Sequence, residues 1–517
     1  MALDPAIVWE VRSTATAANA NGGGFKTGAS GTDFSQQNAA QYNLTSVTTA
    51  AADAIMLHAS AAADMVGNIA YVSAGTNFIV GRYEVISVVV GVSITVDRNC
   101  TSGIGSGGVV AIGGALSLAS SDDAIFEALV AGNKMWVKNA TYVLGGTVSM
   151  SNSGTAQKPI VIEGYATTRG DLPTGSTRPI FDCGTATFTC GADIEWRNIQ
   201  FTGTGFSVLT MGNRNKLLSY KITNNSTSAD RVGLTGGNNA FIFNSEMQCY
   251  RGIAMTTAAG AYTIDSCYIH DSKTGLAHTG AGQSCNIINN IFKNFTTFGI
   301  NCTAAGTESI SINRNTFHGC NVTGTAINLA SGVQIPRIYN NTISNFATGI
   351  AHAGTQTSQF DNYNNMFNNT TNVSGWVQGA NNIALDPAFA VSDVTGTNGT
   401  TSGSVLTSSG KDFTALGVTA GRDFIYLVSG TGITAGIYGI TAVGTTTLTL
   451  DIAPGTDATA DKVYQIVNGA NFAVGTNLKA TGFPGLFPAG YTTGYQDIGA
   501  VQRQESSAST TIPTFRL

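Results

Sequence analysis

A short phrase recurs through residues 195–370 and constrains the fold more than any other feature of the chain. Each copy ends on a large apolar residue, and we call this position the slot. In most copies one or two asparagines come shortly before the slot. The slot residues are Phe201, Ile222, Met247, Tyr268, Phe292, Phe317, Ile343 and Phe367. Successive slots lie 21 to 26 residues apart. A period in the low twenties, broken by Gly and Asn, predicts a solenoid of short strands in which the slot residues stack inward.

A second repeated position lies two residues before the slot on four consecutive copies. It is occupied by Asn290, Asn315, Asn341 and Asn365. Asparagine tolerates left-handed backbone angles, and stacked asparagine amides can hydrogen-bond to one another along a solenoid. We interpret these four residues as an asparagine ladder; the alternative is that asparagine is simply common in turns.

Other stretches resemble known solenoids. The phrase at 158–165, Lys-Pro-Ile-Val-Ile-Glu-Gly-Tyr, and the closing Asp-Pro-Ala-Phe at 386–389 stand at the two ends of the repeats. With the repeats, they resemble the right-handed parallel β-helix superfamily of pectate lyases, polygalacturonases and phage tailspikes, over about residues 115–390. The expected fold is all-β. Apolar spacing and a serine cap at Ser121 predict a helix near 121–131 that would plug the open end of the solenoid.

A smaller unit occurs twice, at 46–114 and 391–467. Its turn and strand residues recur with a displacement of 355 or 354 positions, as Gly75 and Gly430, Gly81 and Gly436, Tyr83 and Tyr438, and Asp97 and Asp451. We predict a duplicated small β-barrel or sandwich module, the second copy being inserted before the closing strands of the solenoid. The remaining segments are an N-terminal arm over 1–45, the β-helix over 115–390, and closing strands with a tail over 468–517.

Composition excludes several classes of protein. Charged residues make up 11% of the chain, the net charge is −5, and no basic cluster occurs, which argues against a nucleic-acid partner. No apolar stretch is long enough to span a membrane, and the N-terminus has no signal-peptide pattern. None of the eight cysteines forms a CxxC pair, so a zinc site is not expected. We expect no other metal and no cofactor. Cys183 and Cys190 could pair across a hairpin or remain free.

Candidate catalytic residues are few. Glu246 and Asp265 lie on adjacent copies close to the slot, where two outward carboxylates could suit inverting hydrolysis, which needs a separation of about 6.5–9.5 Å. His270 and Asp271 lie together on one copy and could form a catalytic or pH-sensitive pair. The alternatives are ordinary surface acids and, for Asp271, a residue that caps a turn.

Aromatic residues on the outer face could bind sugar rings. Tyr250, Tyr262, Tyr339 and Tyr363 are the candidates, provided that they are exposed. Faces rich in Thr and Asn are, however, typical of any exposed solenoid.

The resemblance implies a phage virion protein exposed on the particle surface, either a tailspike- or fibre-like adhesin or a capsid decoration protein, in contact with a host-surface polysaccharide. It also implies a homotrimer that contacts other virion proteins and is made in the host cytoplasm. Two alternatives remain open: a polysaccharide depolymerase, either a hydrolase or a lyase, on the same β-helix, and a secreted bacterial adhesin. The thin supply of acids favours a protein that is not an enzyme.

Overall fold

The computed structural model divides the chain into two compact units, Met1–Thr223 and Asn224–Leu517. Both units are built from β-strands, and the helical elements that the described residues contain in full are two single turns of 3-10 helix, η2 (Ala63–Met65) and η3 (Gly175–Thr177). The described residues are 8–11, 42–66, 69–113, 115–116, 126, 129–166, 170–224, 232–249, 251–256, 260–280, 283–303, 309–319, 323–333, 336–354, 360–375, 377–389, 392–468, 472, 478 and 498–500.

The first unit begins with an antiparallel six-stranded sheet in the order β2-β7-β4-β5-β6-β3. A bridge between Thr48 and Leu57 joins its two edges, so the sheet curls into a barrel around buried aliphatic side chains such as Val72 and Ile94. The strands are β2 (Tyr42–Val47), β3 (Ile55–Leu57), β4 (Ile69–Phe78), β5 (Gly81–Val89), β6 (Ser93–Val96) and β7 (Thr101–Gly113).

The first unit continues as parallel coils. The N-terminal strand β1 lies between β8 and β9 and pairs in parallel with both, so part of the predicted arm belongs to this sheet. This sheet holds β1 (Val8–Val11), β8 (Ala115–Leu116), β9 (Lys134–Lys138), β12 (Ile160–Tyr165), β15 (Ile194–Arg197) and β18 (Lys216–Leu218). The other sheet holds β10 (Thr141–Val143), β11 (Val148–Met150), β13 (Ile180–Asp182), β14 (Phe188–Cys190), β16 (Gln200–Gly203), β17 (Ser207–Thr210) and, at the boundary, β19 (Lys221–Asn224).

Aromatic rings fill the core of these first coils. Phe181, Phe188, Trp196 and Phe201 are fully buried, with ring centroids 5.2 to 6.3 Å apart. Phe126 packs edge-on against Phe181 and Phe188. The predicted capping helix near 121–131 is not supported as an element, because Phe126 is the one described residue of 121–128, in helical conformation, and residues 129–131 are not helical. The buried ring of Phe126 nevertheless covers the core at this point.

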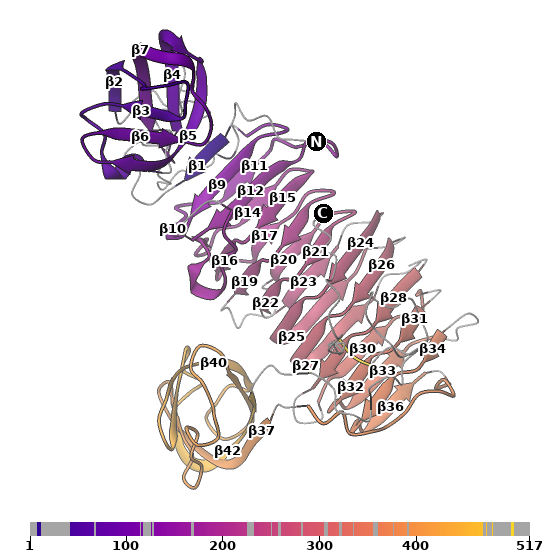
Figure 1. Ribbon diagram of the computed structural model, residues 1–517. Coiled ribbons are helices and arrows are strands. Elements are labelled where there is room, and N and C mark those ends of the chain that lie inside the picture. The colour runs from indigo at the N-terminus through magenta and orange to yellow at the C-terminus, as the bar shows by residue number, and fades with distance from the viewer. Residues whose placement is uncertain are drawn as a thin grey trace, which may run out of the picture. The chain divides into compact units, whose positions relative to one another are not determined.

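The second unit contains the later coils, and Figure 1 shows their strands stacked side by side in the pink and orange part of the ribbon. The described strands of consecutive coils pair in parallel, which makes this part of the chain a parallel β-helix. One sheet holds β21 (Phe241–Phe243), β24 (Gly260–Asp265), β26 (Gln283–Ile288), β28 (Ser309–Asn313), β31 (Pro336–Tyr339) and β34 (Phe360–Asn362). The other holds β20 (Val232–Gly236), β22 (Glu246–Cys249), β23 (Arg251–Met255), β25 (Tyr268–His278), β27 (Ile291–Cys302), β29 (Thr316–His318), β30 (Thr325–Leu329), β32 (Thr342–Ser344), β33 (Thr348–His352), β35 (Asn365–Phe367) and β36 (Thr371–Ser374).

The slot stack is observed, with two corrections of one residue. Met247 pairs with Ile269 rather than Tyr268, and Ile343 pairs with Met366 rather than Phe367. Each slot lies three residues after a position with positive φ, and that position is not always asparagine. The positive-φ residues are Asn198, Ser219, Asn244, Ser266, Asn289, Arg314, Asn340 and Tyr363. Because side chains alternate along a strand, a shift of one residue exchanges the inner and outer faces, which leaves Tyr268 beside the stack rather than in it.

The asparagine ladder is a chain of buried amides. Asn290 Nδ2 donates to Asn315 Oδ1 over 3.0 Å, and Asn315 Nδ2 donates to Asn341 Oδ1 over 3.0 Å. The next member is Asn364, whose Oδ1 accepts from Asn341 Nδ2 over 2.9 Å. The predicted member Asn365 is not part of the ladder, because its side chain hydrogen-bonds to the backbone of Leu385. Each amide also accepts from a backbone N–H of the preceding coil, so these fully buried polar groups are satisfied.

A closed barrel follows the coils in the second unit, with the order β37-β38-β41-β40-β39-β42. Followed around the barrel in the opposite direction, this order is the same as in the first barrel. The register is also the same, because Ala70 pairs with Tyr83 in one barrel and Ile425 pairs with Tyr438 in the other. The duplicated module is therefore confirmed. After this barrel the chain returns to the coils, where Gly499 N donates to Asn340 O over 2.8 Å. The strands are β37 (Ser392–Ser402), β38 (Val405–Thr407), β39 (Phe424–Ser429), β40 (Gly436–Val443), β41 (Thr447–Leu450) and β42 (Asp457–Asn468).

The cysteines within the described residues are all buried and free, so Cys183 and Cys190 are not paired. Burial raises the pKa of both thiols to about 12, which keeps them protonated and unreactive at neutral pH.

Among the described helical elements, none has the length and apolarity that crossing a membrane requires.

Candidate functional site

A buried polar cluster forms where β22, β25 and β27 lie side by side in the second unit. His270 is at its centre: its Nδ1 lies 2.6 Å from Asp271 Oδ2, and its Nε2 lies 3.4 Å from Glu246 Oε1. Asn294 Nδ2 donates to Asp271 Oδ1 over 2.6 Å, and Lys293 Nζ lies 3.9 Å from Asp271 Oδ2. Apart from Glu246, whose side chain is 33% exposed, these residues are almost completely buried.

The coil geometry brings these residues together. His270 on β25 pairs with Lys293 on β27 and with Gln248 on β22. Asp271 follows the slot residue Ile269 by two positions and has a φ of 52°, a conformation that the next coil repeats at Asn294 with 61°. Asp and Asn adopt this left-handed conformation more readily than other side chains. Asp271 is therefore also a turn residue, and its carboxylate is directed by that turn.

Charges in the cluster compensate one another. Burial alone would lower the pKa of His270, but the hydrogen bonds to Asp271 and Glu246 outweigh it, and the pKa is raised. Burial raises the pKa of Asp271, yet the charge of Lys293 and the bonds from His270 and Asn294 hold it below its ordinary value. With His270 protonated, two cations balance two carboxylates, and the cluster is neutral.

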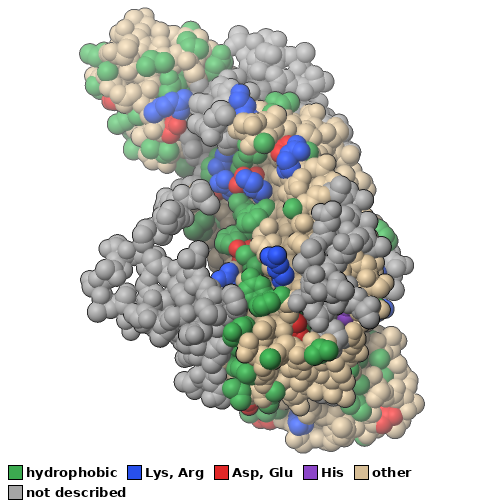
Figure 2. Space-filling model, turned by 90° about the vertical axis from the view of Figure 1, so that its right-hand side faces the viewer, with side chains coloured by type: hydrophobic (Ala, Val, Ile, Leu, Met, Phe, Trp, Pro, Cys, Tyr) green, Lys and Arg blue, Asp and Glu red, His purple; other side chains and the backbone are tan. Residues whose placement is uncertain are grey.

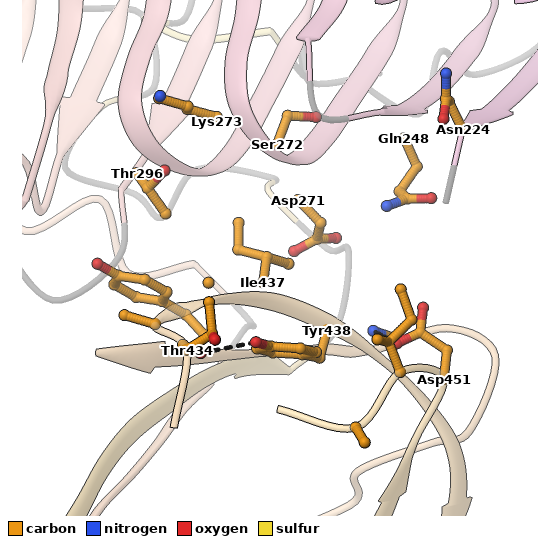
Figure 3. Close-up of a pocket in the computed structure, with 16 residues that line it drawn as sticks. Asn224, Gln248, Asp271, Ser272, Lys273, Thr296, Thr434, Ile437, Tyr438 and Asp451 are labelled. Atoms are coloured by element: carbon orange, nitrogen blue, oxygen red, sulfur yellow. Dashed lines mark hydrogen bonds between the residues drawn. The ribbon is translucent and has the colours of Figure 1, made fainter. Parts of the chain in front are cut away.

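A pocket of about 520 Å³ adjoins this cluster within the second unit. Figure 3 shows coil residues on one side and barrel residues on the other, with Asp271, Gln248 and Tyr438 around the space between them. The wall combines amides, hydroxyls, carboxylates and tyrosine rings. Its residues are Asn224, Gln248, Asp271, Ser272, Lys273, Thr296, Tyr426, Thr434, Ala435, Gly436, Ile437, Tyr438, Gly439, Asp451, Ile452 and Ala453.

The other predicted site residues lie elsewhere. Asp265 ends β24 in the opposite sheet, where its Oδ1 accepts from Ser266 Oγ and Asn289 Nδ2, whereas Glu246 faces His270. The structure therefore joins Glu246 to His270 and Asp271, and it assigns Asp265 to a surface turn.

Three of the four candidate tyrosines can be placed. Tyr262 is buried, with its hydroxyl 3.1 Å from His278 Nδ1, so its ring does not offer a surface to sugars. Tyr339 and Tyr363 are half-buried, and the ring of Tyr339 packs edge-on against Phe360. Tyr250 lies outside the described residues.

A second group of charges lies on the first coils. Lys134 Nζ is 2.8 Å from Glu163 Oε2, and Arg197 Nε donates to Glu195 Oε1 over 2.7 Å. Both carboxylates are buried and compensated by these cations, which is the arrangement of a structural ion-pair ladder. Figure 2 shows that charged side chains are few on the face that it displays, as blue and red groups among tan and green. No group of three or more His, Cys, Asp or Glu side chains in the described part of the chain is placed to hold a metal ion.

No family model and no curated protein matches the sequence. Solved structures with a similar fold include the pectate lyase Pel9A, with 12% identity, a TM-score of 0.41, and coverage of 74% of this chain and 90% of that one. The PL6 family alginate lyase AlyGC has 13% identity and a TM-score of 0.26, over 51% and 52% of the two chains. The tailspike protein gp49 from Pseudomonas phage LKA1 has 10% identity and a TM-score of 0.23, over 82% and 81%. At these scores the assignment to the parallel β-helix class rests on the strand pairing of the chain itself.

Sequence reasoning overlooked Lys293, Asn294 and the barrel wall of the pocket. The first two could have been found by aligning consecutive coils, because they occupy the positions of His270 and Asp271 one coil later. The barrel residues Tyr438 and Asp451 were visible as members of the duplicated module, but nothing in the sequence shows that they face the coils.

Proposed function

We propose that this chain is a polysaccharide-binding β-helix protein and that the pocket of the second unit holds a sugar unit. The observation that carries the proposal is the chemistry of the wall: amides at Asn224 and Gln248 stand with tyrosine rings and hydroxyls in one concave space. Sugars are bound by such sets, because planar polar groups match ring hydroxyls while aromatic rings cover the apolar face of the sugar. Polar side chains here are largely uncharged, which suits a ligand dominated by hydroxyls.

We further propose that the protein acts on the surface of a phage particle, as a homotrimer in contact with other virion proteins. The support comes from the sequence: a low charged fraction, β-helix repeats of tailspike-like pattern, and a barrel module present in two copies. A protein in this position would hold the particle on a host-surface polysaccharide.

Glycan binding is tested by a glycan array probed with the full chain, followed by titration calorimetry on the strongest ligand. Replacement of Gln248 by Leu removes an amide from the pocket wall and is expected to weaken binding about tenfold, as the loss of a ligand hydrogen bond that leaves polar groups unpaired would. Replacement of Gln200, an amide on β16 of the first coils, by Leu is the control. Equal affinity of the two variants would refute the pocket assignment.

The particle role is tested by mass spectrometry of purified virions from the source. Copies in the hundreds would indicate capsid decoration, and a few trimers would indicate a tailspike. Absence from every particle would refute the virion role while leaving glycan binding intact.

A second candidate function is depolymerisation, and one observation favours it. Asp271 and Asp451 both line the pocket, burial raises the pKa of Asp451, and the charge of Lys293 and the bonds from His270 and Asn294 keep that of Asp271 low despite burial. Glycosidases separate the pKa values of two carboxylates in this way. However, both Asp271 oxygens are already engaged by His270 and Asn294, which leaves little capacity for a base. Release of reducing ends or of unsaturated products, abolished in Asp271→Asn and Asp451→Asn, would establish the activity.

A further inference from the structure

The two barrels share one corner, a buried tyrosine beside an exposed aspartate, that differs at a single position. Tyr83, Asp97 and Arg98 of the first barrel correspond to Tyr438, Asp451 and Ile452 of the second. The correspondence is structural as well, because Val85 pairs with Val96 in one barrel and Ile440 with Leu450 in the other, so each aspartate follows the equivalent strand end. The second barrel thus has isoleucine where the first has arginine, at an equivalent corner.

In the first barrel the corner is occupied by its own cation. The guanidinium carbon of Arg98 lies 4.4 Å from the centre of the Tyr83 ring, and Arg98 Nη1 donates to Asp97 Oδ2 over 2.7 Å. A ring face and a carboxylate together make a favourable site for a cation, by cation–π attraction and by a charge-assisted hydrogen bond.

In the second barrel the ring and the carboxylate are kept. Tyr438 Oη donates to Thr434 O over 2.7 Å, as Tyr83 Oη donates to Ile79 O over 2.8 Å, so the two rings are held by equivalent bonds. Asp451 Oδ1 accepts from Gly439 N over 3.0 Å. Ile452 cannot supply a charge, and Tyr438, Asp451 and Ile452 all line the pocket.

We infer that the Tyr438–Asp451 corner binds a cationic group of the ligand, namely the ammonium group of an amino sugar within the bound polysaccharide. The inference rests on the proposed glycan-binding function and specifies its ligand. An ammonium group placed there takes the position that Arg98 fills in the first barrel. An amino sugar fits better than a basic peptide, because the amide and hydroxyl groups on the rest of the wall match the hydroxyls of a sugar.

The other charges of the pocket are compatible with a cation at this corner. The carboxylate of Asp271 is already bonded to His270 and Asn294 and lies 3.9 Å from Lys293 Nζ, so it does not compete for the ligand cation. Lys273 is the cation on the coil side of the pocket, and Figure 3 shows its ammonium directed away from Asp451.

The test compares two sugar probes on the full chain by titration calorimetry at mildly acidic pH: a glucosamine tetramer, which is cationic, and an N-acetylglucosamine tetramer, which is neutral. We expect the cationic probe to bind at least about tenfold more tightly. Asp451→Asn should abolish this preference. Ile452→Arg, which restores the arrangement of the first barrel, should fill the corner and abolish binding of the cationic probe.

The first barrel provides the matched controls. Asp97→Asn removes the equivalent carboxylate there and should leave both affinities unchanged. Ile452 is 38% exposed, so the arginine variant is expected to fold, and circular dichroism checks this. Asp451→Asn, which is isosteric, tests the same corner independently.

The outcomes separate the inference from the function on which it rests. Equal binding of the two tetramers overturns the inference and leaves glycan binding standing. Failure of every probe on the glycan array overturns both. Binding of tetralysine but of neither tetramer overturns the amino-sugar assignment and indicates a basic protein partner instead.

Discussion

The two barrels have the same strand order and register, but each fills one of its ends by different means. In the first, the ring of Phe78 lies over three glycines, so that a Cβ on Gly75, Gly105 or Gly108 would overlap it. In the second, Lys462 stands where Gly108 stands in the first, and its stem lies over Gly430. Its buried ammonium donates to Asp461 over 2.7 Å and to Asp457 over 3.0 Å.

This difference shows which parts of the module are fixed by its backbone. Gly75 and Gly430 are both retained, and their φ angles of 141° and 153° are ones that side chains other than glycine rarely adopt. The filling material is exchangeable, since an aromatic ring and an ion-paired lysine both occupy the space. The module therefore keeps its glycine turn and changes the side chains that pack over it, which is how two copies of one barrel come to have different surfaces.

The largest expected effect concerns this end of the barrel. Phe78→Ala leaves an unfilled space over these three glycines and should destabilise the first barrel by about 3 kcal/mol. Ile433→Ala, at the equivalent position of the second barrel, should cost about 1 kcal/mol, because Ile433 is only half-buried there. Native-state hydrogen exchange on the amides of β4 and β39 measures the two separately. Equal losses would mean that Phe78 does not fill the end of the barrel.

A smaller and equal effect is expected from the tyrosines. Tyr83→Phe and Tyr438→Phe each remove one hydrogen bond to a backbone carbonyl, of Ile79 and of Thr434. Each should cost about 1 kcal/mol in the stability of its own barrel. The same hydrogen-exchange measurement applies. A difference of more than about 1 kcal/mol between the two would contradict the equivalence of the rings.

The pH dependence should distinguish the second barrel from the first. The ring of Phe424 in the second barrel lies 6.0 Å from the ring of His270. The pKa of His270 is raised in the folded state, so the stabilisation that protonated His270 contributes is fully present below about pH 6.5 and is lost as the pH rises through the folded pKa. Asp271 has a lowered pKa, so its contribution is present above about pH 4 and is lost as pH falls through that lower value.

We therefore expect the second barrel to be most stable at mildly acidic pH. Hydrogen exchange of β39 amides between pH 5 and 8, corrected for intrinsic exchange rates, measures this. In His270→Gln the loss of protection on raising the pH should disappear; if it persists, another group is responsible.

The smallest effect is expected at the hairpin between β5 and β6 of the first barrel and its equivalent between β40 and β41 of the second. Val90 and Val92 are exposed in the first barrel by 66% and 55%, whereas the second has Thr445 and Thr446 in the corresponding turn. Val90→Thr with Val92→Thr should change stability by less than about 0.5 kcal/mol, as surface substitutions usually do. It should shorten retention on a hydrophobic-interaction column. Unchanged retention would mean that these valines are not accessible in solution.

The predicted slots show how far sequence reasoning extends and where it stops. Spacing alone identified six of the eight slots correctly. It also identified the small residues that follow the slots, such as Gly275 and Gly299, where an added Cβ would overlap the next coil. It chose Tyr268 over Ile269 and Phe367 over Met366, because the larger aromatic residue matched the other copies better. The turn that fixes the register is formed by Ser266 and Tyr363 in these coils, at a position where most of the other coils have asparagine.

The sequence by itself determined the repeat, the solenoid of short strands and the duplication of a small β module, because these follow from spacings that local sequence displays directly; the parallel β-helix was implied by the family resemblance. Only the tertiary structure decided that the ladder passes through Asn364, that Glu246 and Lys293 join His270 and Asp271, and that Asp451 lies in a pocket. These contacts connect residues more than twenty positions apart, and each depends on which way a strand faces. A register change of one residue reverses that choice, and the spacing of the repeats does not resolve one residue.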